Sequence, residues 1–414
     1  MKLKRVVVTG IGTLTPIGNS LQEYWDNLLK GVSGATCITK FDASKFKTQF
    51  ACEIKDFDIS KYLDRKEARK LDPFAQYAIA TATDAIKDSD IDISKINLDR
   101  AGVIWGTGIG GFTSFISEVS DYARGDGTPK FNPFFIPKII SDIAPGHISM
   151  IFGFRGPNYA TSSACASAAN AIADAFNMIR LGKADLFISG GSEAGVNDAG
   201  VGGFNALHAL STRNDDPTTA SRPFDKDRDG FVVGEGAAAL ILEEYEHAKA
   251  RGAKIYAEMV GTGLSADAHH ITAPHPEGLG AMMAMKNAMD EAEISYDLID
   301  HINTHGTSTP VGDIAEPKAI VALFGEHAYK INLNSTKSMT GHLLGAAAAI
   351  EAIVCCKSIQ EGKLHPTINL ENPDPECDLD YVPNVMQHHQ VEVAVSNSLG
   401  FGGHNGVIVL KKYQ

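Results

Sequence analysis

The chain has 414 residues, 44% of them hydrophobic and 21% charged, as in ordinary globular proteins. Its net charge of −13 excludes a general nucleic-acid binder, and its longest apolar stretch, 343–356, contains a glutamate and is too short to span a bilayer. The apolar run before Gly10 is too short for a signal peptide, and the six cysteines show no Cys-x-x-Cys spacing. We therefore expect reduced thiols, a cytoplasmic location, and neither nucleic-acid nor membrane partners.

Short apolar runs predict β-strands along the whole chain, at 5–8, 102–105, 186–189, 238–242, 391–395 and 407–410. Helical patterns alternate with these runs, which predicts an α/β fold. The Ala-rich helix that follows Cys165 contains Asp174 as its only charged residue up to Met178. A surface helix would carry a wide charged face, so this helix is expected to lie buried between two sheets.

Four segments recur later in the chain in the same order. Residues 103–108 match 303–308, and 84–91 match 287–294. The helix from Cys165 to Lys183 matches the helix that ends at Lys363, and residues 8–11 match 261–264 more faintly. The repeats predict two homologous halves, 1–255 and 256–414, folded together.

Cys165 lies in the segment ATSSACASAA, residues 160–169, at the predicted start of the alanine-rich helix. There, free backbone N–H groups and the helix dipole would favour a thiolate and could stabilise an oxyanion, with Ser162 or Ser163 as the cap. A close-packed helix start that admits only a small side chain is an equally good explanation of the cysteine alone. The other cysteines are interpreted as small buried hydrophobic residues: Cys37, Cys52, Cys355, Cys356 and Cys377.

Two histidines have similar settings, His305 in NTHGTST (303–309) and His342 in STKSMTGH (335–342). A glycine beside each one predicts a tight turn that presents the ring to a cleft. With Cys165, the two rings could form and use a thioester. They could also ligate zinc, although the three residues lack local pairing and Lys337 would oppose a cation.

Three glycine-containing segments resemble known functional motifs. The segment GTGIGG at 106–111 fits a dinucleotide-binding pattern, but a single match is weak. The segment DKDRDG at 225–230 resembles a calcium loop, but Gly236 stands where the bidentate glutamate belongs, so a surface turn is expected. The segment GFGG at 400–403 places Phe401 among flexible glycines, as in a mobile gate over a pocket, although a tight connection is the simpler explanation.

Taken together, the segments around Cys165, His305, His342 and Phe401 resemble the elongating β-ketoacyl-acyl-carrier-protein synthases of type II fatty-acid synthesis. The resemblance covers nearly the whole chain. A Cys–His–His set differs from initiating synthases, which have Asn for the second His, and from thiolases, which have a second Cys. The resemblance implies a thiolase fold of five layers, αβαβα, built from two pseudo-symmetric halves and working as a homodimer.

The resemblance also implies a reaction, the decarboxylative Claisen condensation of an acyl chain on Cys165 with malonyl-acyl-carrier protein. The N–H groups of Cys165 and Phe401 would form the oxyanion hole, and His305 and His342 would hold the malonyl thioester carbonyl. Lys337, paired with Glu351, would order the site. No redox or organic cofactor is implied. A polyketide-type ketosynthase and a non-catalytic chain-length partner subunit remain as alternatives.

Three further groups of residues follow from the resemblance alone. The acyl pocket and substrate contacts would comprise Ile109, Phe135, Phe204, Thr307 and Thr309. A basic surface would dock the acidic carrier protein, although a charge run is usually only a solvated helix face: Lys66, Arg69, Lys70, Arg124, Lys130 and Arg213. A buried structural cation would lie near Asn303, Glu351, Ser396 and Asn397.

Overall fold

Ten strands form one continuous sheet in the order β10-β9-β13-β14-β8-β1-β7-β6-β4-β5. The sheet consists of two five-stranded halves that meet where β1 (Val6–Leu14) pairs with β8 (Ala257–Ala266) over only three residue pairs. The computed structural model describes residues 3–414.

The two halves have the same strand order and the same directions. If the five strands of a half are numbered along the chain, their order in the sheet is 1-5-4-2-3 in both halves. Strand 5 is antiparallel to its neighbours 1 and 4, and strand 2 is parallel to its neighbours 4 and 3. The strands after β1 are β4 (Ala101–Gly106), β5 (Asn158–Thr161), β6 (Leu186–Glu193) and β7 (Gly236–Glu244). Those after β8 are β9 (His301–Asn303), β10 (Asn332–Asn334), β13 (Val393–Gly400) and β14 (His404–Lys411). The repeated order confirms two pseudo-symmetric halves, and the boundary at 255/256 stays a prediction.

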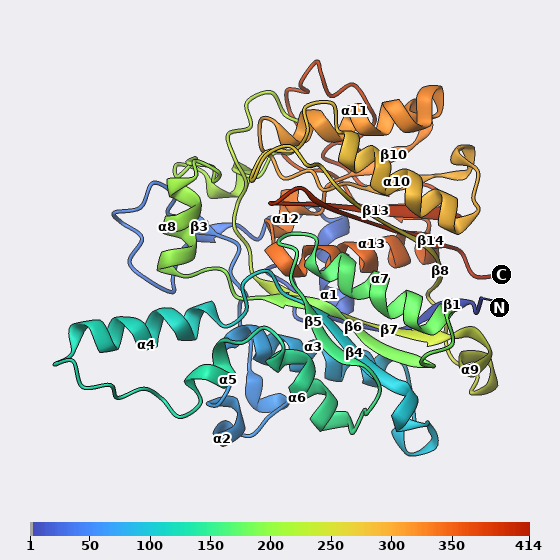
Figure 1. Ribbon diagram of the computed structural model, residues 1–414. Helices are drawn as coiled ribbons and strands as arrows, with labels where there is room; N and C mark the ends of the chain where they lie inside the picture. The colour runs from blue at the N-terminus through green and yellow to red at the C-terminus, as the bar shows by residue number, and fades with distance from the viewer. Residues whose placement is uncertain (1–2) are drawn as a thin grey trace.

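Helices complete the five layers. The central layer is α7 (Ser167–Arg180) and α13 (Ala347–Glu361), each of which packs against strands of both halves. The outer layers are α3 (Pro73–Asp88) with α6 (Ile143–Phe152) on one side and α10 (Leu279–Ala292) with α11 (Gly312–Phe324) on the other. Figure 1 shows α7 and α13 between the two halves. The αβαβα architecture is confirmed.

Glycines on the first strand of each half let a helix approach closely. A Cβ atom at Gly12 of β1 would overlap the carbonyl oxygen of Thr81 in α3, and one at Gly263 of β8 would overlap that of Ala284 in α10. Gly10 and Gly261 approach Ala85 and Ala288 in the same way, so the structure shifts the faint match between 8–11 and 261–264 by two residues. The three stronger matches likewise fall on equivalent elements: β4 and β9, α3 and α10, and α7 and α13.

The six strands predicted from apolar runs are all present, as β1, β4, β6, β7, β13 and β14. The short strands β5, β9 and β10 were not predicted, because three or four residues give too little pattern. Strand β8 was not predicted either, because Glu258 and two glycines interrupt its apolar run. Four of the five cysteines expected to be buried are buried, but Cys37 is exposed, at the end of the two-residue edge strand β2 (Thr36–Cys37). No helix within residues 3–414 is both long and apolar enough to cross a membrane.

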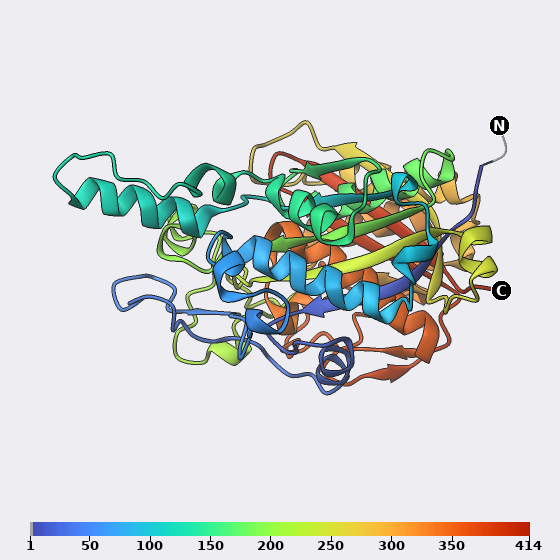
Figure 2. The same ribbon diagram turned by 90° about the horizontal axis from the view of Figure 1, so that it is seen from below.

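An arm made of α4 (Phe112–Arg124), a return loop and α5 (Phe135–Ile139) projects from the body (Figures 1 and 2). The remaining elements are α1 (Leu21–Leu29), β3 (Phe50–Ala51), α2 (Arg65–Ala68), α8 (Asp198–Ala206), α9 (Tyr245–Ala250), α12 (Lys337–Thr340), β11 (Lys363–Leu364) and β12 (Gln387–His388).

Candidate active site

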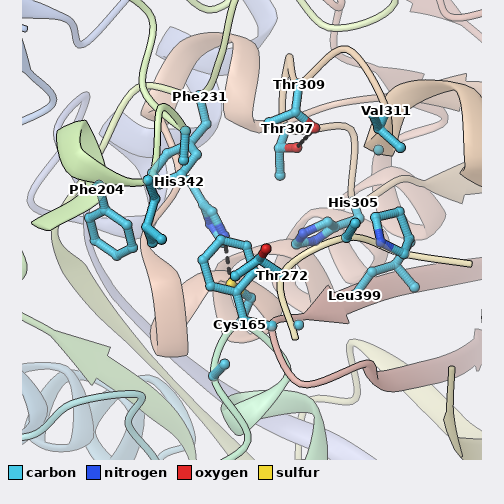
Figure 3. Close-up of a pocket in the computed structure, with 18 of the residues that line it drawn as sticks. Cys165, Phe204, Phe231, Thr272, His305, Thr307, Thr309, Val311, His342 and Leu399 are labelled. Atoms are coloured by element: carbon cyan, nitrogen blue, oxygen red, sulfur yellow. Dashed lines mark hydrogen bonds between the residues drawn. The ribbon is translucent and has the colours of Figure 1, made fainter. Parts of the chain in front are cut away.

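Residues from both halves line a pocket of about 540 Å³ that contains Cys165, His305 and His342. Cys165 lies between β5 and α7, His305 follows β9, and His342 follows α12. Sγ and one nitrogen of each ring lie within 4.8 Å of one another, and His342 Nε2 is 2.9 Å from Sγ. The two rings are nearly perpendicular, with centroids 5.2 Å apart (Figure 3). The fold thus brings together three residues that are far apart in the sequence.

A strained turn presents the Cys165 thiol. Ala164 has a φ of +50°, in the left-handed region, and the Ser167 hydroxyl accepts the N–H of Ser163 while donating to the Ala164 carbonyl. Helix α7 begins only at Ser167, with Ala166 as its N-cap and no side-chain cap. The predicted helix start at Cys165 and the predicted serine cap are therefore wrong, because the Ser167 hydroxyl closes the turn instead.

Burial controls the protonation of this site. It raises the pKa of the Cys165 thiol to about 11, although the Lys337 charge and the N–H groups of Phe401 and Cys165 act in the opposite direction. Burial, together with the Lys337 charge, holds the pKa of both His305 and His342 well below the usual range. At neutral pH the site thus contains a protonated thiol and two neutral rings. The expected thiolate is not favoured, since desolvation outweighs the helix start.

Backbone groups fix how the two rings are used. His342 Nδ1 accepts the N–H of Leu344 at 3.2 Å, so the neutral ring carries its proton on Nε2, which faces Sγ. His342 therefore presents a hydrogen-bond donor to the reacting position. The backbone of His305 is held by the buried Glu316, which accepts the N–H groups of His305 and Gly306 at 2.9 and 3.0 Å.

Lys337 and Glu351 form a buried ion pair, and the Lys337 charge acts on both rings. Their side chains are 1% and 0% exposed. Burial raises the pKa of Glu351 to about 7, even though Lys337 lowers it. The predicted pairing is present, and it places one positive charge beside both histidines. The same charge disfavours a zinc ion on the Cys–His–His set.

The pocket wall contains Ile109, Phe204, Thr307, Thr309 and Phe401, as predicted. The Thr307 and Thr309 hydroxyls are 3.0 Å apart (Figure 3).

Phe135 does not line the pocket of the single chain, and its part in the acyl pocket stays a prediction. Its ring stacks on Phe131 and Phe115 in the projecting arm, with centroids 5.3 and 6.3 Å apart. Aromatic neighbours that are close in the sequence therefore hold Phe135 away from the pocket.

The threonine loop is held by two buried residues that the sequence did not reveal as functional. Arg228 donates to the carbonyl oxygens of Thr309 and Pro310, and its side chain is 2% exposed. Asp313 accepts the N–H of Ser308, whose φ of +70° is in the left-handed region. The segment 225–230 forms a turn that is exposed at Lys226 and Asp227, as predicted, while the buried Arg228 supports the threonine loop from within it. Phe224 and Phe231 on either side of it were the available signal.

The predicted docking residues lie in three places. Lys66 and Arg69 are exposed on and just after α2, and Lys70 there is half-buried beside Glu67. Arg124 ends α4 and Lys130 lies in the return loop, both exposed. Arg213 follows α8. Figure 1 shows α2, α4 and α8 on the same side of the molecule.

The predicted cation ligands include four buried oxygens that lack a partner within residues 3–414: Asn303 Oδ1, Glu351 Oε2, Ser396 Oγ and Asn397 Oδ1. Asn303 and Ser396 are register neighbours on β9 and β13, and Glu351 lies on α13, which packs against these strands. Asn397 follows Ser396 and must point to the opposite face, where it donates to Glu316. Asn303, Ser396 and Glu351 thus lie on neighbouring elements, and the cation with its four ligands stays a prediction.

Two family models together match most of the chain. Residues 3–248 match the N-terminal domain of beta-ketoacyl synthase, and residues 256–371 match the C-terminal domain. The 3-oxoacyl-[acyl-carrier-protein] synthase 2 of Synechocystis sp. is 50% identical to this chain, over 100% of this chain and 99% of that protein. The protein of the same name from Staphylococcus aureus is 51% identical, over 99% of both.

Solved structures show the same fold. The ishigamide ketosynthase/chain length factor superposes with a TM-score of 0.94 at 34% identity, over 100% of both chains. A beta-ketoacyl synthase from Burkholderia phymatum superposes at 0.91 and 35% identity, over 99% of this chain and 100% of that one. A type II PKS ketosynthase in complex with its acyl-carrier protein also superposes at 0.91, with 34% identity over 100% of both chains. The fold and the site define a thiolase-fold condensing enzyme. The chain belongs to the beta-ketoacyl synthase family.

Proposed function

We propose that this chain catalyses the decarboxylative Claisen condensation of fatty-acid elongation. An acyl chain on Cys165 and malonyl-acyl-carrier protein would give 3-oxoacyl-acyl-carrier protein, carbon dioxide and free carrier protein. The observation that carries the proposal is the approach of Sγ and the two histidine rings within 4.8 Å inside one pocket. The names of the relatives that are half identical over the full length support the same reaction.

The first step is acyl transfer to sulfur. Sγ of Cys165 attacks the carrier thioester carbonyl, whose oxygen becomes negative, while the N–H groups of Cys165 and Phe401 face this position. The C–S bond to the carrier breaks, and the departing sulfur takes the proton of the Cys165 thiol. Because the thiol is protonated in the resting site, this proton is available where the leaving group needs it.

The second step breaks a carbon–carbon bond. The Nε2–H of His342, and the ring of His305 beside it, bind the malonyl thioester oxygen. Loss of carbon dioxide then leaves an enolate whose charge lies on that oxygen. The enolate carbon attacks the acyl carbon on Cys165, a new C–C bond forms, and the C–S bond to Cys165 breaks. Sγ leaves as a thiolate and takes up one proton from solvent, which restores the resting thiol. No electron carrier is needed, since nothing is oxidised or reduced.

The partner that this reaction requires is an acidic carrier protein. Lys66 and Arg69 are exposed beside the projecting arm and give this acidic chain a local positive surface. A related ketosynthase has been solved in complex with its acyl-carrier protein. We place the reaction in the cytoplasm, where six free cysteines would remain reduced.

We also propose that the chain works as a homodimer. Large exposed apolar side chains concentrate on the arm and α6: Phe115, Val119, Tyr122, Phe131, Phe134, Ile136, Ile140, Met150 and Ile151. The neighbouring β5 is the edge strand of the sheet. Light scattering should give twice the mass of one chain. The Ile136→Glu variant should lower this mass, and Val385→Glu, at another highly exposed position, should not.

One experiment separates the proposal from its alternatives. The chain alone, with a saturated acyl-carrier and malonyl-carrier, should release one carbon dioxide per acyl chain and give a 3-oxoacyl-carrier two carbons longer. Repeated extension of the unreduced product would indicate a polyketide-type ketosynthase. Activity only in the presence of a second, related chain would indicate a chain-length partner subunit.

A further inference from the structure

We infer that Glu193 is a positioning residue that makes His342 sensitive to the length of the acyl chain. This inference rests on the proposed function. Glu193 ends β6, is 1% exposed, and touches neither Cys165 nor either catalytic histidine through a hydrogen bond. Its carboxylate nevertheless connects the acyl-pocket wall to the turn that orients His342.

The carboxylate accepts four hydrogen bonds from two loops. Oε2 accepts the N–H of Gly108 at 2.6 Å and that of Gly345 at 3.0 Å. Oε1 accepts the Thr107 hydroxyl at 3.0 Å and the N–H of Ile109 at 3.2 Å. All four donors are neutral, so three backbone N–H groups and the Thr107 hydroxyl hold this buried carboxylate without a cation.

The first of these loops carries the acyl-pocket wall and supports the nucleophile. Ile109 lines the pocket. Gly108 lies against the turn before Cys165, because the Ser162 hydroxyl donates to its carbonyl and a Cβ atom at Gly108 would lie 3.5 Å from the Ala164 carbonyl oxygen.

The second loop fixes His342. Gly345 follows Leu344, whose N–H sets the ring tautomer through Nδ1. The two loops come from different halves and touch directly, since a Cβ atom at Gly345 would overlap the N–H of Gly108. An acyl chain that displaces Ile109 therefore pulls on the same carboxylate that holds the His342 turn. The length of the acyl chain thus affects the rate of the condensation step through His342, in addition to the limit set by the space in the pocket.

The test measures condensation rates over a series of acyl-chain lengths. In Glu193→Gln, the amide group would face two N–H or O–H donors and lose two of the four bonds. We expect the condensation rate with the best acyl chain, divided by the rate with the longest accepted chain, to fall at least threefold. Loss of folded protein alone would lower every rate equally and leave this ratio unchanged. Glu243→Gln, which removes a buried carboxylate of β7 bonded to Thr9, His247 and Arg251, is the matched control.

A milder pair keeps the inference testable if Glu193→Gln does not fold. Thr107→Val removes one of the four bonds, and Thr107→Ser retains the hydroxyl. We expect Thr107→Val to flatten the ratio and Thr107→Ser to preserve it. Unchanged ratios in folded Glu193→Gln and in Thr107→Val would overturn the inference.

A second readout does not need the condensation reaction. Glu193 adds negative charge near the thiol and so contributes to raising the pKa of Cys165. Alkylation of Cys165 by iodoacetamide should therefore reach half its maximal rate at a lower pH in Glu193→Gln than in wild type, and at an unchanged pH in Glu243→Gln. An unchanged profile in Glu193→Gln contradicts the inference. Absence of condensation in wild type, with the alkylation shift present, would instead count against the proposed function.

Discussion

Removal of Lys337 should expose how much the buried ion pair contributes. Lys337→Ala leaves the Glu351 carboxylate without its cation, and loss of one partner of a buried pair typically costs about 3–5 kcal/mol. Whole domains are usually stable by only about 5–15 kcal/mol, so the change in the free energy of unfolding should be large. Glu351 can reduce the loss by taking up a proton.

The size of the loss should therefore depend on pH. The pKa of Glu351 is about 7 in the folded chain, against about 4.3 for a free glutamate, and loss of Lys337 raises the folded value further. A carboxyl whose pKa is raised by folding destabilises the fold as pH rises above the unfolded pKa. Wild type and variant share this effect up to about pH 7. Above that pH, only the variant continues to lose stability, by about 1.4 kcal/mol per pH unit until its carboxyl ionises.

Urea unfolding of wild type and Lys337→Ala at about pH 6 and about pH 8.5 measures this difference. The variant should be less stable at both values, and more so at the higher one. The double variant Lys337→Met/Glu351→Leu should recover most of the stability, because a buried pair can often be replaced by apolar groups without loss. Equal denaturation midpoints for wild type and Lys337→Ala at both pH values would refute this account of the pair.

The same variant should impair decarboxylation more than carrier binding. The Lys337 charge lowers the pKa of His305 and His342, so its removal raises both pKa values. Because the reaction uses neutral rings, the acid limb of the decarboxylation rate should move to higher pH, while the KM for malonyl-carrier protein stays within about twofold, a difference of about 0.4 kcal/mol. Full activity with an unmoved profile would reject an ordering role for Lys337.

Three further predictions concern the substrate, the carrier and the cation. Ile109→Phe should shorten the longest product, measured by mass spectrometry of the carrier-bound chains, and extension of a long chain equally well by variant and wild type would contradict the pocket assignment. Reversing the charges of Lys66 and Arg69 should raise the KM for the carrier protein in a salt-dependent manner. Lys249→Glu on α9 is the control, and an unchanged KM in the Lys66 and Arg69 variant would remove α2 from the docking surface. Potassium chloride or sodium chloride should raise the melting temperature above that in choline chloride, and Ser396→Ala should lose this increase. Equal melting temperatures of the wild type in all three salts would argue against the cation.

Local sequence patterns predicted the framework of the fold well. Long apolar runs and ordered internal repeats are strong signals, and they identified six strands and the two equivalent halves. Cys165, His305 and His342 were found because small residues and glycine around a reactive side chain are unusual. Strands β5, β8, β9 and β10 and the start of α7 were missed, since tertiary pairing determines these strands and the Ser167 hydroxyl determines the helix start.

The supporting residues of the site escaped sequence reasoning for a different reason. Glu193 and Arg228 act through backbone groups more than 80 residues away, and no local spacing reports such contacts. Asp313 and Glu316 hold backbone N–H groups 5 to 11 residues before them, across an irregular loop that follows no periodic pattern. The only signal for Glu193 was a charge that ends a strand of apolar and small residues. The place of Phe135 in the projecting arm could not be predicted either, because packing on Phe131 decides where its ring lies.

The central claim is that Cys165 carries the acyl chain. The intact mass of the protein after incubation with a long-chain acyl-carrier protein tests it most directly, beside the Cys165→Ala variant. Wild type should gain the mass of the acyl chain, and the variant should gain none. Absence of the adduct on wild type while the carrier still binds, or an equal adduct on both proteins, would contradict it.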